Sequence, residues 1–234
     1  MRSKHFIRRH FEDLIILQCL RWYPKYPISY RQLSEMMSER GVDVNHTTIY
    51  RWIQRYSPHF AKEIRWYAKP LGFTWHIDET YIKVKGQWKY LYRAIDGNGY
   101  TIDFWLSHKQ NTKSALYFFK RVLKSCYEHP SCIHTDQHRS LLKAVKILKQ
   151  NDVISQTTEH ITDKASNNRI ESDHFRIKRI IKPMLGFKSF HTANRCIKGL
   201  EAMLMVVKNQ TLGLTKTLQD QIKFIHKLFD VHTA

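Results

Sequence analysis

Cysteine is scarce in this sequence, and its four cysteines are widely scattered. No Cys-x-x-Cys pair occurs, so neither a disulfide framework nor a zinc ribbon is indicated. Glycine is also scarce, at eight residues in 234, and no glycine-rich loop is followed by Lys. A loop of that kind would cradle the phosphates of a nucleotide, so we expect no nucleotide cofactor and no other cofactor-binding residues.

Long apolar runs are missing as well. No run approaches the roughly 20 residues of a membrane-spanning helix, so we expect an intracellular protein without a membrane partner. Acidic residues are few, since 20 Asp and Glu stand against 39 Lys and Arg and give a formal charge of +19. That excess exceeds what solubility requires and indicates a polyanionic partner, for which nucleic acid is the first candidate.

The N-terminal part of the chain has the pattern of a helix-turn-helix. A helix predicted over residues 10–23 is followed by a second helix that begins with a capping box of Ser29 and Gln32. Gly41 ends that helix as a left-handed cap, and a third helix begins at Asn45 or His46. Pro24 and Pro27 are expected to stop the first helix, and Ser57-Pro58 the third.

The third helix leaves a polar side for solvent, and we predict that this side contacts DNA. Hydrogen-bonding and cationic groups of this kind suit base edges and phosphates. A polar face on an ordinary helical hairpin is the alternative, and the charge of the chain favours DNA. The candidate residues are Asn45, His46, Thr47, Tyr50, Arg51, Gln54 and Arg55.

A second domain is predicted after residue 70, where aromatic and β-branched residues become frequent. Three strands over 73–84, 88–95 and 100–106, joined by short turns, predict an antiparallel meander. A helical stretch over 112–126 then leads to a fourth strand at 131–135, which this helical crossover adds to the sheet as a parallel strand. A helix over 139–149, an extended piece near Val153 and helices over 168–181 and 192–207 follow.

These elements predict an α/β fold, an RNase H-like mixed β-sheet flanked by helices, preceded by a small all-α helix-turn-helix domain. The expected domains are 1–70, 71–210 and a helical C-terminal tail over 211–234. The tail has apolar residues at helical spacing, and we expect it to pack on this protein or on a second copy.

Three acids interrupt segments that are otherwise apolar or cationic. Asp78 lies in the first strand and Asp136 follows the fourth, so the two converge if those strands are neighbours. Glu171 lies on a basic helix together with Lys178, seven residues later and therefore on nearly the same face, about 10.5 Å along the axis. Carboxylates are the ligands that Mg²⁺ prefers, and two such ions support attack on a phosphodiester. We therefore predict that Asp78, Asp136 and Glu171 bind Mg²⁺, with two ions expected and Mn²⁺ as a substitute.

Each acid also has a structural alternative. Asp136 would cap the helix after it, Glu171 would complete an N-terminal cap with Asn168, and strand alternation leaves open whether Asp78 or Glu79 is buried. His134, Asp136 and His138 have the spacing of a transition-metal site, a pattern that alternation at a strand end also produces. The ordered set of three acids in a basic chain favours catalysis. Further cations on the helix of Glu171 are expected to bind DNA: Arg176, Lys178, Arg179 and Lys182.

Several segments share the pattern of one known family: residues 75–86, Trp88, residues 90–96, Thr135-Asp136-Gln137, residues 167–174, 186–189 and 197–201, and, in the first domain, Tyr30-Arg31 and residues 49–52. Through them the chain resembles the DDE transposases of small, cointegrate-forming bacterial insertion sequences, and the resemblance covers about 6–210. His138-Arg139 departs from it, because relatives tend to have small residues there.

The resemblance implies an RNase H-like catalytic domain with Asp78, Asp136 and Glu171 as the triad and Lys178 as its basic companion. It further implies a protein of the bacterial cytoplasm that recognises terminal inverted repeats in double-stranded DNA, cleaves to a 3′-hydroxyl and joins it to target DNA as a homo-oligomer. Two alternatives remain open: a DNA-binding regulator with a silent second domain, and a nuclease that cuts without joining.

Overall fold

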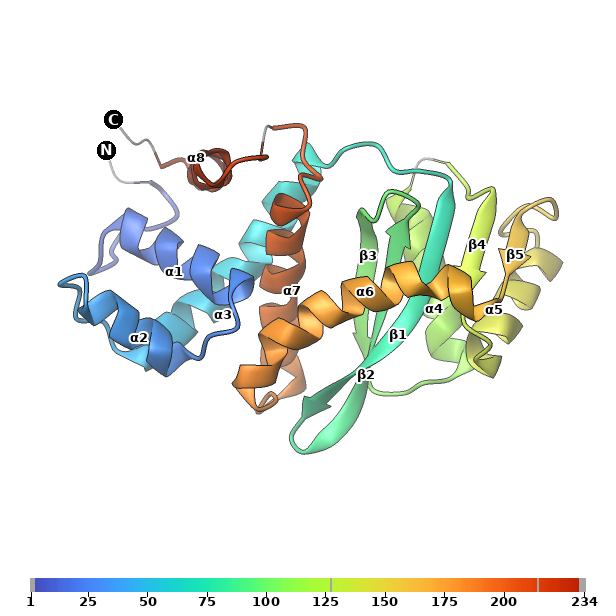
Figure 1. The fold of residues 1–234 in the computed structure, drawn as a ribbon, viewed down its shortest axis with the longest axis horizontal. Coiled ribbons are helices and arrows are strands. Elements are labelled where there is room, and N and C mark those ends of the chain that lie inside the picture. Colours follow the sequence, from blue (N-terminus) through green and yellow to red (C-terminus); the bar gives the residue numbers. More distant parts are fainter. Residues whose placement is uncertain (1–2, 127, 214, 232–234) are drawn as a thin grey trace. The chain divides into compact units, whose positions relative to one another are not determined.

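The computed structural model describes residues 3–126, 128–213 and 215–231, and the chain divides into two compact units. Unit 1 comprises residues 1–69 and 179–234, and unit 2 comprises residues 70–178 (Figure 1). Along the sequence, unit 2 is therefore an insertion between two parts of unit 1. None of the described helices combines the length and apolarity needed to cross a membrane.

Unit 1 is helical, and its core collects residues from both ends of the chain. Apolar side chains of the N-terminal helices pack with those of the two C-terminal helices. The elements are α1 (Asp13–Lys25), α2 (Tyr30–Ser38), α3 (His46–Glu63), the 3₁₀ turns η1 (Ile64–Tyr67) and η2 (Lys182–Met184), α7 (Phe190–Val207) and α8 (Leu218–Leu228).

The predicted helix-turn-helix pattern is present in unit 1. Ser29 and Gln32 form the capping box at the start of α2, and Gly41 has a positive φ of 75° in the turn that follows. Asn45 is the N-cap of α3, because its side chain accepts a hydrogen bond from the backbone amide of Thr47 at 2.9 Å. Short-range hydrogen bonds fix both helix starts.

The prediction that prolines stop the first and third helices was partly wrong. Pro24 lies inside α1, but that helix ends at Lys25, before Pro27. Pro58 lies inside α3, which continues to Glu63. A proline removes one backbone hydrogen bond and crowds the preceding turn. At Pro58 that cost is offset by packing, since Phe60 and Ile64 beyond it are fully buried in the core of unit 1.

The C-terminal helices α7 and α8 belong to unit 1. Unit 1 therefore includes residues on both sides of the expected boundary at residue 210. Residues 179–210, which the sequence assigns to the catalytic domain, pack with the N-terminal helices. The tail forms α8 and packs on this chain through Phe224, Ile225 and Leu228. Tail residues 214 and 232–234 lie outside the described residues. Unit 2 starts at Pro70.

Helices α3 and α7 approach closely where Gly199 faces Ser57. A Cβ atom at Gly199 would meet the Ser57 hydroxyl oxygen and lie 2.8 Å from the Ser57 Cβ. A contact at that distance forces the two helices apart. The absence of a side chain at Gly199 therefore permits this packing.

Replacing Gly199 with Ala is expected to destabilise the protein. Alanine favours a helix over glycine by up to about 1 kcal/mol, but overpacking costs typically 1–3 kcal/mol, so we expect a net loss of about 1 kcal/mol. In a Ser57→Gly background the same substitution should stabilise, because the opposing atoms are gone. Thermal unfolding of the four proteins measures this reversal. A destabilisation of equal size in both backgrounds would contradict the steric explanation.

Unit 2 is built on a five-stranded mixed sheet in the order β3-β2-β1-β4-β5. The antiparallel meander is confirmed, and so is the parallel direction of the fourth strand, which pairs with the first. Together with its flanking helices, this sheet confirms the predicted RNase H-like α/β class. The strands are β1 (Thr74–Val84), β2 (Gln87–Asp96), β3 (Thr101–Ser107), β4 (Cys132–Thr135) and β5 (Glu159–Ile161).

The extended piece predicted near Val153 was wrong. The fifth strand lies at Glu159–Ile161, where it pairs parallel with β4. Val153 instead closes the end of the preceding helix, because its backbone amide donates to the carbonyl of Leu148 at 2.9 Å. The apolar character of Val153 serves packing against the core of unit 2 and not strand pairing.

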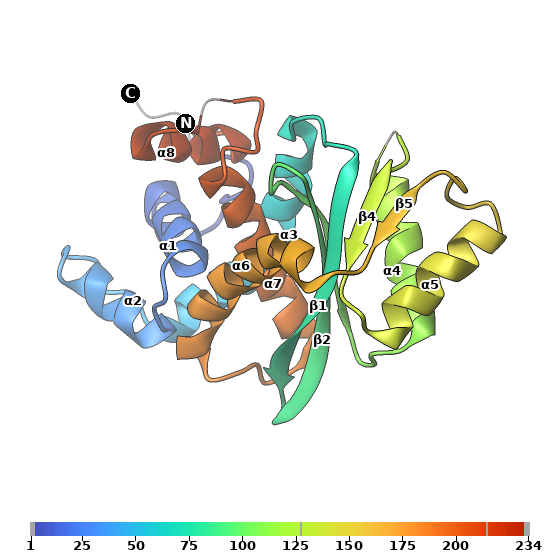
Figure 2. The same cartoon turned by 45° about the vertical axis from the view of Figure 1, so that its right-hand side comes forward.

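Helices cover both faces of the sheet in unit 2. Helices α4 (Thr112–Ser125) and α5 (Arg139–Gln150) lie on one side, and α6 (Lys164–Ile181) crosses the other (Figures 1 and 2). The core between the sheet and α4 and α5 contains Trp75, Ile77 and Phe118. Because side chains alternate along a strand, Glu79 shares the face of Ile77, and Asp78 belongs to the face that α6 crosses.

Candidate active site

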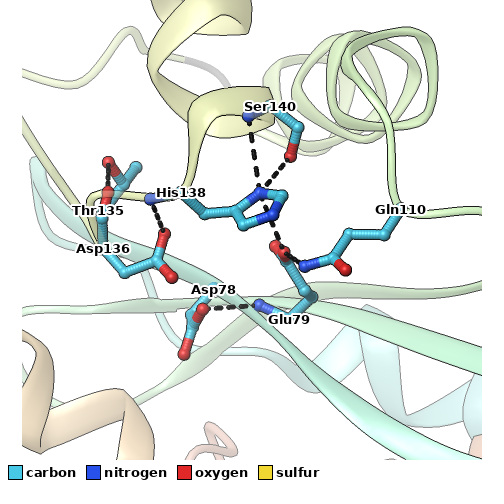
Figure 3. A network of polar contacts seen from close by, with 7 residues as sticks. All are labelled: Asp78, Glu79, Gln110, Thr135, Asp136, His138 and Ser140. Atoms are coloured by element: carbon cyan, nitrogen blue, oxygen red, sulfur yellow. Dashed lines mark hydrogen bonds and ion pairs between the residues drawn. The ribbon is translucent and has the colours of Figure 1, made fainter.

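Two predicted acids come from neighbouring strands. In the parallel pairing of β1 with β4, Ile77 lies opposite Thr135, and an aspartate follows each of them. Asp78 and Asp136 therefore stand at the same edge of the sheet, as the sequence predicted for neighbouring strands. Figure 3 shows the two carboxylates close to each other.

Each of these aspartates is anchored through one carboxylate oxygen. Asp78 Oδ1 accepts a hydrogen bond from the backbone amide of Glu79 at 2.8 Å, and Asp136 Oδ1 accepts one from the amide of His138 at 2.9 Å. Asp136 thus binds the backbone just before α5, while the N-cap of α5 is His138. The alternative in which Asp136 caps α5 is therefore wrong. Asp136 instead supports the turn that leads to the N-cap residue His138.

The electrostatic surroundings of Asp78 favour binding of a cation. The pKa of Asp78 is raised to about 8, first by burial and then by the negative charges of Asp136, Glu79 and Glu171. Among these residues, negative charge is concentrated around a carboxyl group whose side chain is only 13% exposed. A divalent cation would relieve this repulsion, and carboxylate oxygens suit Mg²⁺. Asp78 and Asp136, brought together by the pairing of β1 with β4, are therefore two suitable ligands for such an ion.

Glu171 lies on α6 and is exposed. The helix begins at Lys164, seven residues earlier, so Glu171 is in the helix interior. The alternative in which Glu171 completes an N-terminal cap with Asn168 is therefore wrong. Lys178 is exposed on the same helix, and the separation of seven residues gives it nearly the same direction as Glu171.

No three His, Cys, Asp or Glu side chains within the described residues are grouped closely enough to hold a metal ion. The charge of Glu171 contributes to the raised pKa of Asp78, so the two acids interact electrostatically. His134 and His138 do not form a ligand group with Asp136: His134 stacks on His76, with ring centroids 4.4 Å apart, and His138 caps α5.

A buried ion pair connects α6 to the sheet. Arg93 on β2 is fully buried, and its guanidinium lies 2.7 Å from the carboxylate of Asp173 on α6. Asp173 is two residues beyond Glu171, so this pair sets the position of that part of the helix. Sequence reasoning missed it, because no local pattern links residue 93 to residue 173. An arginine between Tyr92 and Ala94, in the buried half of β2, was the one available signal.

His174 lies beside Asp78 in the same layer. Its Nδ1 atom is 3.7 Å from Asp78 Oδ2, at the distance of an ion pair. Burial lowers the pKa of His174 well below its usual range, and the nearby charges of Arg93 and Lys178 lower it further. The imidazole is therefore neutral near pH 7 and does not neutralise Asp78.

A second polar network lies on the opposite face of β1 and was also missed. The buried carboxylate of Glu79 accepts a hydrogen bond from Gln110 and lies 3.6 Å from His138 Nδ1 (Figure 3). His138 Nδ1 is also 2.8 Å from the hydroxyl of Ser140. Of the adjacent acids, Glu79 is the more buried. His138, the departure from the family pattern, thus has a structural position beside the site.

The predicted DNA-contacting residues differ in exposure. Asn45 and Thr47 hydrogen-bond to each other at the start of α3, and His46 is half-buried. Gln54 is buried and donates to the carbonyl of Thr192 at 3.3 Å. Those that are exposed are Asn45, Thr47, Tyr50, Arg51, Arg55, Arg176, Lys178, Arg179 and Lys182.

Comparison with known proteins identifies the class of this chain. A family profile described as a DDE domain matches residues 72–210, more than half of the sequence. The chain belongs to the DDE transposase family, which confirms the resemblance seen in the sequence.

Curated relatives specify the kind of transposase. It is 38% identical over 211 residues to the transposase for insertion sequence-like element IS431mec of Staphylococcus aureus, covering 90% of this chain and 92% of the relative. Identity and coverage are the same for the transposase of insertion sequence element IS257 in transposon Tn4003, also from Staphylococcus aureus. The protein is thus an insertion-sequence transposase, an enzyme that cuts and joins DNA.

Solved structures similar to this chain include integrase catalytic core domains. The HTLV-2 integrase core in complex with magnesium is 17% identical, with a TM-score of 0.43, and the match covers 57% of this chain and 85% of that one. The BIV integrase core is 11% identical, with a TM-score of 0.39, covering 58% of this chain and 83% of that one.

Proposed function

We propose that this transposase binds the terminal inverted repeats of its insertion sequence and catalyses Mg²⁺-dependent strand cleavage and strand transfer into target DNA. The observation that carries the proposal is the placement of Asp78, in β1, beside Asp136, which directly follows the parallel strand β4. The pKa of Asp78 is raised first by burial and then by the charges of Asp136, Glu79 and Glu171. The repulsion among these acids is what binding of divalent cations would relieve.

Asp78 and Asp136 would hold the metal through the carboxylate oxygens that do not bind backbone amides. Glu171 would complete the site from α6. Two Mg²⁺ ions, or Mn²⁺ as a substitute, supply activation of the attacking oxygen and stabilisation of the departing one. Lys178, on nearly the same face of α6 as Glu171, would bind a phosphate of the DNA. Neutral His174 would leave the carboxylate of Asp78 to the metal.

The proposed partners are double-stranded DNA, as element end and target, and further copies of this chain. Joining two element ends requires at least two active sites, which supports a homo-oligomer. The excess of 39 Lys and Arg over 20 Asp and Glu supports a polyanionic partner. A bacterial cytoplasmic location follows from this role.

Strand transfer in vitro tests the proposal. Purified protein with Mg²⁺, a labelled duplex carrying an element end and a plasmid target should yield joined product. Glu171→Gln should abolish joining while DNA binding and thermal stability persist, because the variant loses only a charge on an exposed side chain. Glu159→Gln, which changes an exposed acid on β5, is the matched control and should join normally.

The alternatives give different products. A nuclease would release 3′-hydroxyl ends without joined product, and a regulator would bind the element end without metal-dependent cleavage. Equal joining by wild type and Glu171→Gln would exclude Glu171 from the triad.

A further inference from the structure

A groove of about 900 Å³ lies in unit 1, and every residue that lines it belongs to that unit. Its lining comes from three segments that are distant in sequence: residues 8–11 before α1, residues 48–55 of α3 and residues 191–195 of α7. The exposed side of the predicted recognition helix α3 is therefore one wall of a larger concave surface.

The groove is strongly cationic. Five arginines line it, with two histidines, and none of the described residues that line it is Asp or Glu. A concave surface with charge of a single sign focuses the electrostatic potential and attracts ligands of opposite charge. The arginines are Arg8, Arg9, Arg51, Arg55 and Arg195.

The N-terminal wall is held in place by the core of unit 1. Phe6 is fully buried and stacks on Phe229, with ring centroids 5.7 Å apart. The Ser3 amide donates to Asp13 Oδ2 at 2.9 Å, and the Arg9 amide donates to the carbonyl of Phe6 at 3.1 Å. Arg8 and Arg9 are therefore positioned by packing and do not belong to a free tail.

The α7 wall is also fixed relative to α3. Gln54 of α3 donates to the carbonyl of Thr192, and the close approach of Gly199 to Ser57 joins the same two helices further along. Ser189 caps α7, accepting from the amide of Thr192 at 3.2 Å. The first turns of α7 thus present Arg195 beside the recognition helix from a rigid support.

We propose that Arg8, Arg9 and Arg195 bind the sugar-phosphate backbone of duplex DNA while α3 contacts the bases. The inference rests on the proposed binding of this chain to its element ends and assigns the phosphate contacts to residues outside the helix-turn-helix. Guanidinium groups bind phosphate oxygens through paired hydrogen bonds. Contacts to the backbone position a protein on DNA without reading its sequence.

Binding measured by fluorescence anisotropy over a series of NaCl concentrations tests the groove. The probes are a duplex carrying the element end and a scrambled duplex of the same length. The variants are Arg8→Gln, Arg195→Gln and their combination, and the matched control is Lys62→Gln, which alters an exposed cation on α3 outside the groove.

Each groove variant should weaken binding to both duplexes by a similar factor. The slope of log K against log salt should fall by about 0.9 for each phosphate that the variant no longer binds, and by about twice that in the double variant. Lys62→Gln should leave the slope unchanged. An unchanged slope in a double variant that melts at the wild-type temperature would overturn the inference.

Two further outcomes separate this inference from the proposed function. If the wild-type protein joins DNA but the double variant has an unchanged salt slope, DNA binding by the groove is refuted and the proposed transposition chemistry stands. If the double variant has a reduced salt slope but the wild-type protein never cleaves DNA, DNA binding by the groove is supported and the proposed transposition chemistry is refuted. Competition with poly-glutamate tests whether DNA is the occupant of the groove. If poly-glutamate at equal charge displaces DNA and binds the protein more tightly than DNA does, DNA is not the specific occupant.

Discussion

Replacing Asp78 with Asn is expected to abolish strand transfer and, at the same time, to make the metal-free protein more stable. Asn keeps the size of the side chain but removes the charge that would hold the metal. Loss of one electrostatic stabiliser of a transition state costs up to about a thousandfold in rate, and removal of a metal ligand should cost at least that much. Joined product should fall below detection.

The stability gain follows from the pKa of Asp78. The carboxyl has a pKa of about 8 in the folded protein against 3.8 for an ordinary aspartate, so the folded state binds more protons between these values. The free energy of unfolding of the wild type should therefore decrease as the pH rises from about 4 to 8 and then level off. Each unit of pKa shift corresponds to about 1.36 kcal/mol, so the variant should be more stable at pH 8 by more than that.

Thermal unfolding at pH 5 and pH 8 measures the effect. The difference in stability between Asp78→Asn and wild type should be larger at pH 8, and addition of Mg²⁺ should stabilise the wild type more than the variant. Asp43→Asn, at an exposed position between α2 and α3, should show neither trend. A wild type whose stability rises from pH 5 to pH 8 relative to Asp78→Asn would contradict this account.

Breaking the buried pair of Arg93 and Asp173 is expected to have the largest effect on stability. Arg93 is fully buried and the Asp173 side chain is 6% exposed, so Arg93→Met would leave a carboxylate inside the protein without that guanidinium. Removing one partner of a buried pair costs about 3–5 kcal/mol. The pair also connects α6 to the sheet two residues from Glu171, so strand transfer should fall with it.

A double variant separates loss of charge balance from loss of packing. Arg93→Met combined with Asp173→Leu should recover most of the stability, because apolar residues of similar volume replace a buried pair at little cost. Lys4→Met breaks an exposed pair with Asp230, whose side chains are 74% and 51% exposed, and should change stability by less than about 1 kcal/mol. Equal losses of stability for Lys4→Met and Arg93→Met in chemical denaturation would refute this explanation.

Local signals in the sequence predicted much of the fold. Ser29, Gln32 and Asn45 satisfy backbone groups within three residues, so their roles follow from sequence alone. The antiparallel pairing of β1, β2 and β3 followed from the predicted order of elements, whereas the sequence left open whether β4 lies beside β1 and brings Asp136 to Asp78. The catalytic roles of these acids, of Glu171 and of Lys178 stay predictions.

Long-range packing explains what the sequence did not predict. Pro58 continues a helix because buried residues beyond it outweigh one missing hydrogen bond. Helix α7 joins unit 1 because Gly199 lets it approach Ser57, although the two residues are far apart in the sequence. Arg93 and Asp173, 80 positions apart, gave no joint pattern. In each of these three examples, the structure depends on a contact with a residue distant in the sequence, which the neighbouring residues do not specify.

The division of unit 1 between residues 1–69 and 179–234 has a consequence for biosynthesis. On a ribosome, which adds roughly 5–20 residues per second, α1 to α3 emerge first but lack the core partners supplied by α7 and α8. Unit 2, continuous in sequence, is complete before they appear. The nascent chain should therefore acquire its catalytic sheet before its N-terminal helices are stabilised, so a protein interrupted before α7 would lack a finished unit 1.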